Sequence, residues 1–365
     1  MALGAEVANA EGVTDTEIKL GMSNALSGAS AALGTGMKSG ATAFFTKLNA
    51  AGGVAGRKIN LVSYDDTYEP AKAVENTKKL IETDKVFALF GYVGTPTSTA
   101  VLPLAGKNKV PYFAPFSGAE FLRNPVNPMV YNIRSSYFDE TEAQVEFLTT
   151  KLSVKKIGIF MQDDAYGAAG ESGLLRALKK RNLQITGKGK YARNTVDVAG
   201  GVKELKMAAP EAIVMVGSYK ACAEFVKQAK ASGVKAVFLN LSFVGTSAFI
   251  SEVGNDGEGV YITQVVPSPW DTSIPVVKEY QADMKAQGAT SYDYTSLEGY
   301  IAAKAFGEAL KGPGKSLTVE SLLSSFNGMN IDLGGFSVRF SPTDHAGSKK
   351  VWLTIVKGGK AEAVN

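Results

Sequence analysis

The stretch that decides the fold runs from Val86 to Leu122 and reads VFALFGYVGTPTSTAVLPLAGKNKVPYFAPFSGAEFL. Residues 86–90 form an apolar run typical of a strand buried on both faces, and a second such run follows at 110–114. Each run ends in a turn with hydroxyl side chains, followed by a helical pattern. In a parallel sheet both turns lie at one edge, where helix N-termini and hydroxyls suit a carboxylate. The alternative is that the hydroxyls only cap helices.

Strands and helices alternate at short spacing on both sides of this stretch, which predicts doubly wound parallel sheets. Before it we expect a long loop at 23–36 and a helix at 37–49; from Lys155 the alternation starts again. The sequence therefore predicts an α/β protein with two doubly wound lobes joined by crossover hinge strands. The predicted division is 14–135 plus 266–340 for one lobe and 136–265 plus 341–365 for the other, with a ligand cleft between them.

Composition excludes several classes of protein. Hydrophobic residues make up 45% of the chain, but no apolar run approaches the roughly 20 residues of a membrane span, so no direct membrane insertion is expected. Basic residues are interspersed with acidic ones, which argues against a nucleic-acid partner. The single cysteine, Cys222, allows no intramolecular disulfide and is expected to be a buried small hydrophobe. The single histidine, His345, lies in a polar turn and is expected at the surface.

Two motifs resemble nucleotide or catalytic sites without meeting their requirements. The glycine-rich segment 34–40 is not a phosphate loop, because Met37 separates Gly36 from Lys38. Acid pairs at 65–66 and 163–164 could serve as acid and base, although solvated turn residues are commoner. With one histidine and one cysteine, a zinc site of the usual His/Cys kind is nearly excluded, and a Ser-His-Asp triad would have to use His345. We therefore predict no enzyme, no catalytic residue, no cofactor and no metal.

The N-terminus contains a motif that resembles the cleavage site of a signal peptide. Ala8-Asn9-Ala10, followed by Glu11, matches a signal-peptidase site, but the charged and apolar regions that normally precede it are absent. We interpret the motif as the end of a trimmed signal peptide removed near Ala10, which predicts a periplasmic protein; a chance match is the alternative.

Taken together, the chain resembles a type I periplasmic solute-binding protein of the Leu/Ile/Val (branched-chain amino-acid) group of ABC transporters. The resemblance covers roughly residues 16–356, and it rests on the order and spacing of several motifs, none of which is decisive alone. These motifs are Ser27-Gly28, Ala51-Gly-Gly-Val-Ala-Gly, Tyr64-Asp-Asp, the turn from Gly91 to Ser98, Val110-Pro111, Asp164-Ala-Tyr-Gly and Gly217-Ser-Tyr219.

The resemblance implies a carboxylate site on the first lobe. The hydroxyl of the first turn, which binds the ligand carboxylate in the family, corresponds to Thr95. The second turn corresponds to Phe116, Ser117 and Gly118, where Gly118 stands at the position of a family threonine, so Ser117 would supply the hydroxyl. Leu33 matches a first-loop residue, often aromatic, that covers the ligand side chain.

On the second lobe, Tyr166 and Tyr219 match two tyrosines that close over the ligand. The acidic residue that pairs with the ligand ammonium falls at Ser242, which carries no charge. Because a buried ammonium without a counter-charge is costly, either Asp164 or Glu298 takes over or the ligand has no α-amino group.

The predicted pocket is rich in aromatic residues, which suits an apolar or aromatic ligand body. About half of the candidates are expected to face the cleft and the rest to fill the lobe cores. The candidates are Tyr92, Phe116, Tyr166, Tyr219, Phe243, Tyr292 and Tyr294. The family disulfide is absent, and Tyr68 and Gly94 stand about where its cysteines would be.

The function implied is capture of a small carboxylate ligand, in the first instance an amino acid, by lobe closure and delivery to a membrane permease of an ABC transporter. Two alternatives remain open at this point. The ligand could be an amine-free aromatic or aliphatic carboxylate, or the protein could serve as a ligand sensor for a membrane receptor.

Overall fold

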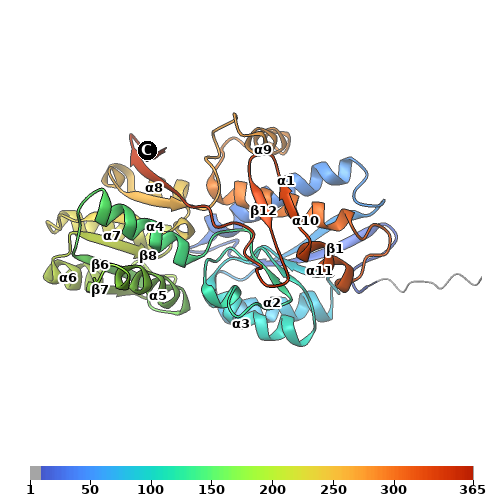
Figure 1. Ribbon diagram of the computed structural model, residues 1–365, viewed down its shortest axis with the longest axis horizontal. Coiled ribbons are helices and arrows are strands. Elements are labelled where there is room, and N and C mark those ends of the chain that lie inside the picture. Colours follow the sequence, from blue (N-terminus) through green and yellow to red (C-terminus); the bar gives the residue numbers. More distant parts are fainter. Residues whose placement is uncertain (1–9, 365) are drawn as a thin grey trace, which may run out of the picture.

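The computed structural model describes residues 10–364 and shows an α/β fold with two mainly parallel sheets (Figure 1). The motif at Ala8–Ala10 lies almost wholly outside this range. The first sheet has the strand order β2-β1-β3-β4-β5, and all its pairings are parallel. Its strands are β1 (Glu17–Asn24), β2 (Lys58–Asp65), β3 (Ala88–Phe90), β4 (Tyr112–Phe113) and β5 (Val130–Tyr131).

The second sheet has the strand order β14-β13-β10-β9-β8-β6-β7. Pairings from β7 to β10 are parallel, whereas β13 and β14 add an antiparallel edge. The strands are β6 (Ile157–Gln162), β7 (Ile185–Tyr191), β8 (Ala212–Val216), β9 (Val237–Asn240), β10 (Tyr261–Gln264), β13 (Trp352–Lys357) and β14 (Lys360–Ala363). The predicted fold class is confirmed.

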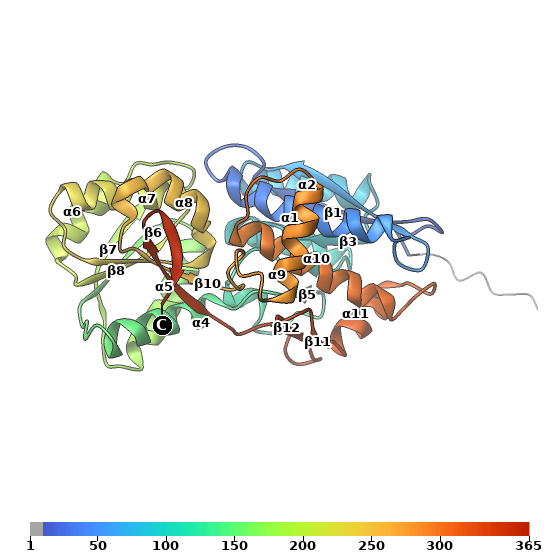
Figure 2. The same ribbon diagram turned by 90° about the horizontal axis from the view of Figure 1, so that it is seen from above.

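Helices pack on each sheet and make two lobes, which lie side by side in Figures 1 and 2. The first lobe, on the five-stranded sheet, has α1 (Ala31–Ala50), α2 (Pro70–Glu82), α3 (Thr95–Lys107), α9 (Pro275–Ala286), α10 (Tyr294–Lys311), α11 (Val319–Asn327) and the hairpin β11 (Asn330–Asp332) to β12 (Ser337–Arg339). The second lobe has α4 (Tyr137–Thr150), α5 (Ala165–Lys179), α6 (Ala199–Ala208), α7 (Tyr219–Ala231) and α8 (Thr246–Val253). Short 3₁₀ turns complete the fold: η1 (Glu120–Leu122), η2 (Ser242–Val244) and η3 (Gly254–Gly257).

The chain passes between the lobes after β5, after β10 and between β12 and β13. The last passage is visible as the red segment that leaves the hairpin β11–β12 and reaches the second sheet (Figure 2). Several passages between two sheets make each lobe discontinuous in sequence, which places the junction of the lobes beside the ends of β5 and β10.

Most predicted elements agree with the structure to within a few residues, but the prediction for the first helix is wrong. Helix α1 begins at Ala31 rather than at residue 37, so the last part of the expected loop, residues 31–36, is helical. Its glycines allow close approach to neighbouring backbone: a Cβ on Gly34 would lie 2.0 Å from the oxygen of Ala25, and one on Gly40 would lie 1.7 Å from the oxygen of Ser296 in α10. A glycine-rich segment thus reflects helix packing here and not a flexible loop.

Helix α4 and the strands β5, β11 and β14 were not predicted. The sequence signal for α4 is a capping box: the Ser136 side chain accepts a hydrogen bond from the backbone N–H of Asp139, and the Asp139 carboxylate accepts one from the backbone N–H of Ser136. This pattern marks the start of a helix at Tyr137, and α4 turns out to carry residues of the candidate site.

His345 is buried, not at the surface as predicted. Its ring stacks on Tyr131 with centroids 3.9 Å apart, and its Nδ1 lies 2.9 Å from the oxygen of Val130. Burial lowers the pKa of His345, partly offset by the backbone oxygens it contacts. The polar turn around it covers the end of β5, which hides the imidazole despite its polar sequence neighbours. Cys222 is buried as predicted, and burial raises the pKa of its thiol.

Candidate functional site

The two turns after β3 and β4 bring their hydroxyls together. The Oγ1 atom of Thr95, at the start of α3, lies 2.8 Å from the Oγ atom of Ser117, and both side chains are buried. A parallel bridge joins Val93 to Phe116, and the N–H of Phe116 donates to the oxygen of Tyr92. The parallel sheet therefore places both predicted hydroxyls at one edge.

Only the first of these turns opens an α-helix, because η1 is a 3₁₀ turn of three residues. The helix next to the second turn is α4, whose Tyr137 N–H donates to the oxygen of Gly118 at 2.6 Å. A Cβ on Gly118 would lie 2.5 Å from Cδ1 of Tyr137. The missing side chain at position 118 therefore makes room for the Tyr137 ring, which explains the glycine where the resemblance leads one to expect threonine.

Five buried aromatic rings join the two lobes, and we call them the aromatic cluster. Phe243 in η2 is central: its ring centroid lies 4.4 Å from that of Tyr166, 5.5 Å from that of Phe116 and 6.1 Å from that of Tyr68. Tyr137 joins through Tyr166, at 5.4 Å. Each of the five is at most 1% exposed. Tyr68 and Phe116 come from the first lobe, and Tyr166 and Phe243 from the second.

Leu33 and Tyr219 both lie where α1 meets the second lobe. The backbone N–H of Ala32 in α1 donates to the Tyr219 hydroxyl at 3.3 Å. A Cβ on Gly245 of the second lobe would lie 2.5 Å from Cδ2 of Leu33 and 4.0 Å from Cδ1 of Tyr219. Gly245, with φ +75°, thus lets the second lobe approach α1 closely.

Three predicted aromatics lie elsewhere. Tyr92 packs against Tyr112 inside the first lobe, and its hydroxyl lies 2.9 Å from that of Thr77. Tyr292 packs against Tyr280, and Tyr294 against Trp270. The structure does not bring these three to the aromatic cluster, since each side chain fills a local core or a lobe surface.

Both acids expected to replace a charge at position 242 have basic partners of their own. Asp164 accepts a hydrogen bond from the Tyr166 N–H, as N-cap of α5, and pairs with Arg193 at 3.0 Å. Glu298 of α10 binds Arg134 through two hydrogen bonds of 2.8 and 2.9 Å, with both side chains buried. Burial lowers the pKa of Arg134, but the Glu298 carboxylate more than offsets this and keeps it above its ordinary value.

A third acid, Glu140 of α4, was missed by the sequence reasoning. It is fully buried and accepts hydrogen bonds from the N–H of Ser242 at 2.8 Å, the hydroxyl of Ser242 at 3.0 Å and the hydroxyl of Thr263 at 2.5 Å. Burial raises the pKa of Glu140, although Arg134 and these donors act in the opposite direction. The capping box at Ser136 would have placed it on the first turn of a helix.

Several buried polar atoms of the candidate site and of the adjacent start of α1 lack a hydrogen-bond partner among residues 10–364. They include the Ser30 hydroxyl beside Leu33, the Tyr166 hydroxyl and the Nη1 atom of Arg134. The Arg134 guanidinium lies 4.0 Å over the ring of Phe116. Since buried donors are rarely left unsatisfied, these atoms are available to the oxygens of a small polar ligand.

At the rim, polar contacts tie the lobes together. Arg193, which follows β7, donates to Glu69 at 3.0 Å, and the Asn194 side-chain amide donates to Glu69 at 2.7 Å and to the backbone oxygen of Thr67 at 3.1 Å. Because Arg193 also pairs with Asp164, it links the N-terminus of α5 to the loop before α2.

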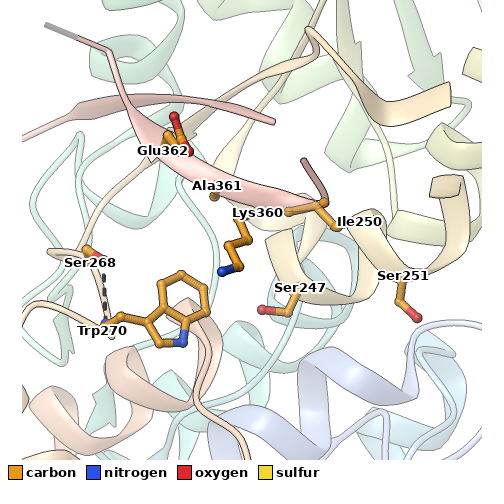
Figure 3. A pocket seen from close by; sticks show the side chains of 9 residues that line it. Ser247, Ile250, Ser251, Ser268, Trp270, Lys360, Ala361 and Glu362 are labelled. Atoms are coloured by element: carbon orange, nitrogen blue, oxygen red, sulfur yellow. Dashed lines mark hydrogen bonds between the residues drawn. The ribbon is translucent and has the colours of Figure 1, made fainter. Parts of the chain in front are cut away.

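A separate cavity of about 790 Å³ lies between α8, β14 and the segment after β10 (Figure 3). Trp270 forms one wall and Lys360 of β14 points toward it, while Ser247 and Ile250 of α8 lie opposite. Trp270 is 45% exposed, and none of the predicted ligand residues lines this cavity. It has no buried charged side chain, so we place the candidate site at the aromatic cluster instead.

Within residues 10–364, no helix has the length and apolar character needed to cross a membrane. The same range contains no group of three or more histidine, cysteine or acidic side chains arranged to hold a metal ion.

The sequence of the chain is similar to those of known proteins over most of its length. A family model described as "Periplasmic binding protein" matches residues 17–361. A relative from Brucella abortus named Leu/Ile/Val-binding protein homolog 7 is 26% identical over 345 residues, with 89% of this chain and 85% of the relative covered.

Two solved structures agree over nearly the whole chain. A possible leucine/isoleucine/valine-binding protein from Rhodopirellula baltica is 33% identical with a TM-score of 0.92, covering 96% of this chain and 97% of that one. A substrate-binding periplasmic protein from Ralstonia solanacearum is 30% identical with a TM-score of 0.88, covering 93% and 98%. The chain therefore belongs to the type I periplasmic binding proteins, in the Leu/Ile/Val-binding protein family, and is a non-enzymatic solute-binding protein of the ABC-transporter type.

Proposed function

We propose that this protein captures an amino acid between its two lobes in the periplasm and delivers it to the permease of an ABC transporter. The lobes are residues 14–135 plus 266–340 and 136–265 plus 341–365, and they close about the ligand by hinge motion. The names of the relatives, which refer to leucine, isoleucine and valine, support an amino acid as the ligand class. Export through a signal peptide removed near Ala10 belongs to the same proposal.

The observation that carries the proposal is the junction of the lobes itself. Side chains from both sheets converge there in a buried cluster, with a hydroxyl pair from two strand-end turns on the first lobe. A ligand carboxylate at Thr95 and Ser117 would also lie at the N-terminus of α3, where the helix dipole favours a negative charge. The rings of the aromatic cluster would then enclose the apolar part of the ligand.

The remaining predicted residues have roles that follow from their positions. Gly118 offers the backbone N–H of the second turn, and Phe116 contributes its ring through the aromatic cluster. Leu33 and Tyr219 cover the ligand where α1 meets the second lobe. Tyr166 supplies a buried hydroxyl without a partner among the described residues. Asp164 acts indirectly, because it caps α5 and holds Arg193.

A thermal-shift screen of the purified protein against the twenty amino acids and a set of amine-free carboxylates tests this function. A ligand present at 100 times its Kd adds about 2.7 kcal/mol to the free energy of unfolding, which is readily seen. A shift from amino acids supports the proposal. A shift from amine-free acids alone would favour the alternative ligand class, and no shift from either set would contradict carboxylate binding.

The Thr95→Ala variant then tests the carboxylate position. Loss of a hydroxyl that donates to a carboxylate should weaken binding about 10-fold. Thr99→Ala is the matched control, since Thr99 lies one turn further along α3 and is exposed. Equal affinities for the two variants in titration calorimetry would remove Thr95 from the site.

A further inference from the structure

A buried carboxylate without an ion-pair partner lies at the junction of the lobes. Glu140 is fully buried, yet all three of its hydrogen bonds come from neutral groups, namely the N–H and hydroxyl of Ser242 and the hydroxyl of Thr263. No basic side chain described by the structure lies within 4.0 Å of it. Ionised carboxylates are costly to bury unless they are paired, so this side chain would gain from a cation.

The nearby acids cannot take this role without losing an existing pair. Glu298 is held by two hydrogen bonds from Arg134, and Asp164 is held by Arg193. Arg134 affects Glu140 through its charge, but its contacts are with Glu298 and the ring of Phe116. Of Glu140, Asp164 and Glu298, only Glu140 has no basic side chain within 4.0 Å among the described residues.

Glu140 is also well placed relative to the proposed carboxylate position. Helix α4 begins at Tyr137, whose N–H donates to Gly118 in the second turn, and Glu140 follows within one turn, a rise of about 4.5 Å along the axis. Its partner Ser242 directly precedes Phe243 at the centre of the aromatic cluster. Glu140 is therefore one turn from the residue that contacts the second turn and is hydrogen-bonded to the neighbour of the central ring of the cluster.

We propose that Glu140 is the counter-charge for the α-ammonium of a zwitterionic amino-acid ligand. The side chain at position 242, where the resemblance expects an acid, reaches the same place: the Ser242 hydroxyl lies 3.0 Å from Oε1 of Glu140. In this proposal the negative charge is supplied from α4, and the hydrogen bond from the Ser242 hydroxyl orients it. This inference rests on the proposed function and names the residue that makes the site selective for an ammonium group.

The test compares amino acids with their amine-free counterparts: leucine with 4-methylpentanoate, phenylalanine with 3-phenylpropanoate, and any other amino acid found in the thermal-shift screen with its own analogue. Calorimetry on the whole protein should give at least 10-fold tighter binding of the amino acid. Glu140→Gln keeps the shape and removes the charge, so it should weaken amino-acid binding by about 10- to 100-fold while changing analogue binding less than about 3-fold. Glu142→Gln, two residues along α4 and paired at the surface with Lys180, should change neither.

If Glu140→Gln does not fold, a second variant that moves the carboxylate to position 242 provides the test. The double variant Glu140→Ser with Ser242→Glu moves the carboxylate across the observed hydrogen bond and should restore the preference for amino acids. A wild-type protein that binds analogues as tightly as amino acids would overturn the role of Glu140 while leaving carboxylate capture intact. An unchanged ratio in Glu140→Gln, or a lost ratio in the double variant, would overturn it as well. If no amino acid or analogue binds the wild type, the proposed function fails together with it.

Discussion

At the scale of single residues, two tyrosine rings occupy space that is open because a nearby position in another segment is glycine. Tyr137 occupies the space that a side chain at Gly118 would fill, since a Cβ on that glycine would lie 2.5 Å from Cδ1 of the ring. In the same way, a Cβ on Gly94 would lie 2.3 Å from Cε2 of Tyr68, so the Tyr68 ring packs against this glycine. The resemblance implies the family disulfide at about these two positions. In both cases a glycine in one segment accommodates a tyrosine from another.

Asp66 gives a prediction at this scale. It is buried, accepts hydrogen bonds from the Ser23 hydroxyl and the Tyr68 N–H at 2.8 Å each, and so supports the turn that presents Tyr68, whose φ is +61°. Burial raises the pKa of Asp66 from 3.8 to about 6, although these hydrogen bonds lower it. The folded state therefore binds the proton more tightly than the unfolded chain.

The contribution of Asp66 to stability should be fully present below about pH 4 and should be lost as the pH rises through about 6, a change on the order of 3 kcal/mol. Denaturant unfolding of the wild type and of Asp66→Asn at pH 4 and pH 7 measures this change. The wild type should gain stability relative to the variant at the lower pH. A difference between the two proteins that is independent of pH would refute the shift.

At the scale of elements, α4 connects folding to binding. Its capping box fixes the first turn, which contains both Tyr137 and Glu140. Ser136→Ala removes the acceptor for the Asp139 N–H and should cost about 1 kcal/mol in the free energy of unfolding. Because the first turn also contacts Gly118, ligand affinity should fall as well, which titration calorimetry would detect.

Helix α11 offers a matched control, since it has its own capping box between Thr318 and Ser321. Thr318→Ala should cost a similar free energy but leave ligand affinity unchanged, because α11 contributes no residue to the candidate site. If both variants affected affinity equally, the loss at Ser136 would reflect general destabilisation and not the position of α4.

At the scale of the whole molecule, the contacts of Glu69 hold the rims of the two lobes together. Glu69→Ala removes the ion pair with Arg193 and the hydrogen bond from Asn194. Because the ion pair is partly exposed, we expect a moderate effect: ligand dissociation about 3- to 10-fold faster in stopped-flow measurements, with the association rate nearly unchanged. Glu308→Ala, which breaks the Lys311 pair within α10, is the control, and equal dissociation rates in the two variants would show that the Glu69 contacts do not hold the lobes.

The sequence by itself determined the fold class and most of the elements, because apolar runs and helical periodicity report local burial, and burial sets the sheet and helix pattern. It also predicted the meeting of Thr95 and Ser117, since strands of a parallel sheet place their ends at one edge. The start of α1 was predicted wrongly because its glycine-rich composition is typical of a loop, whereas these glycines allow close helix packing.

Only the tertiary structure decided which charges and rings share the junction. Glu140 and Ser242 are 102 residues apart in the chain yet hydrogen-bonded, and His345 is covered by packing on Tyr131 despite polar neighbours in sequence. Nothing in the sequence indicated that Asp164 and Glu298 form ion pairs with Arg193 and Arg134, which makes them unsuitable partners for a ligand ammonium. Such pairings depend on how lobes and helices approach in space, and local spacing carries no information about contacts between distant segments.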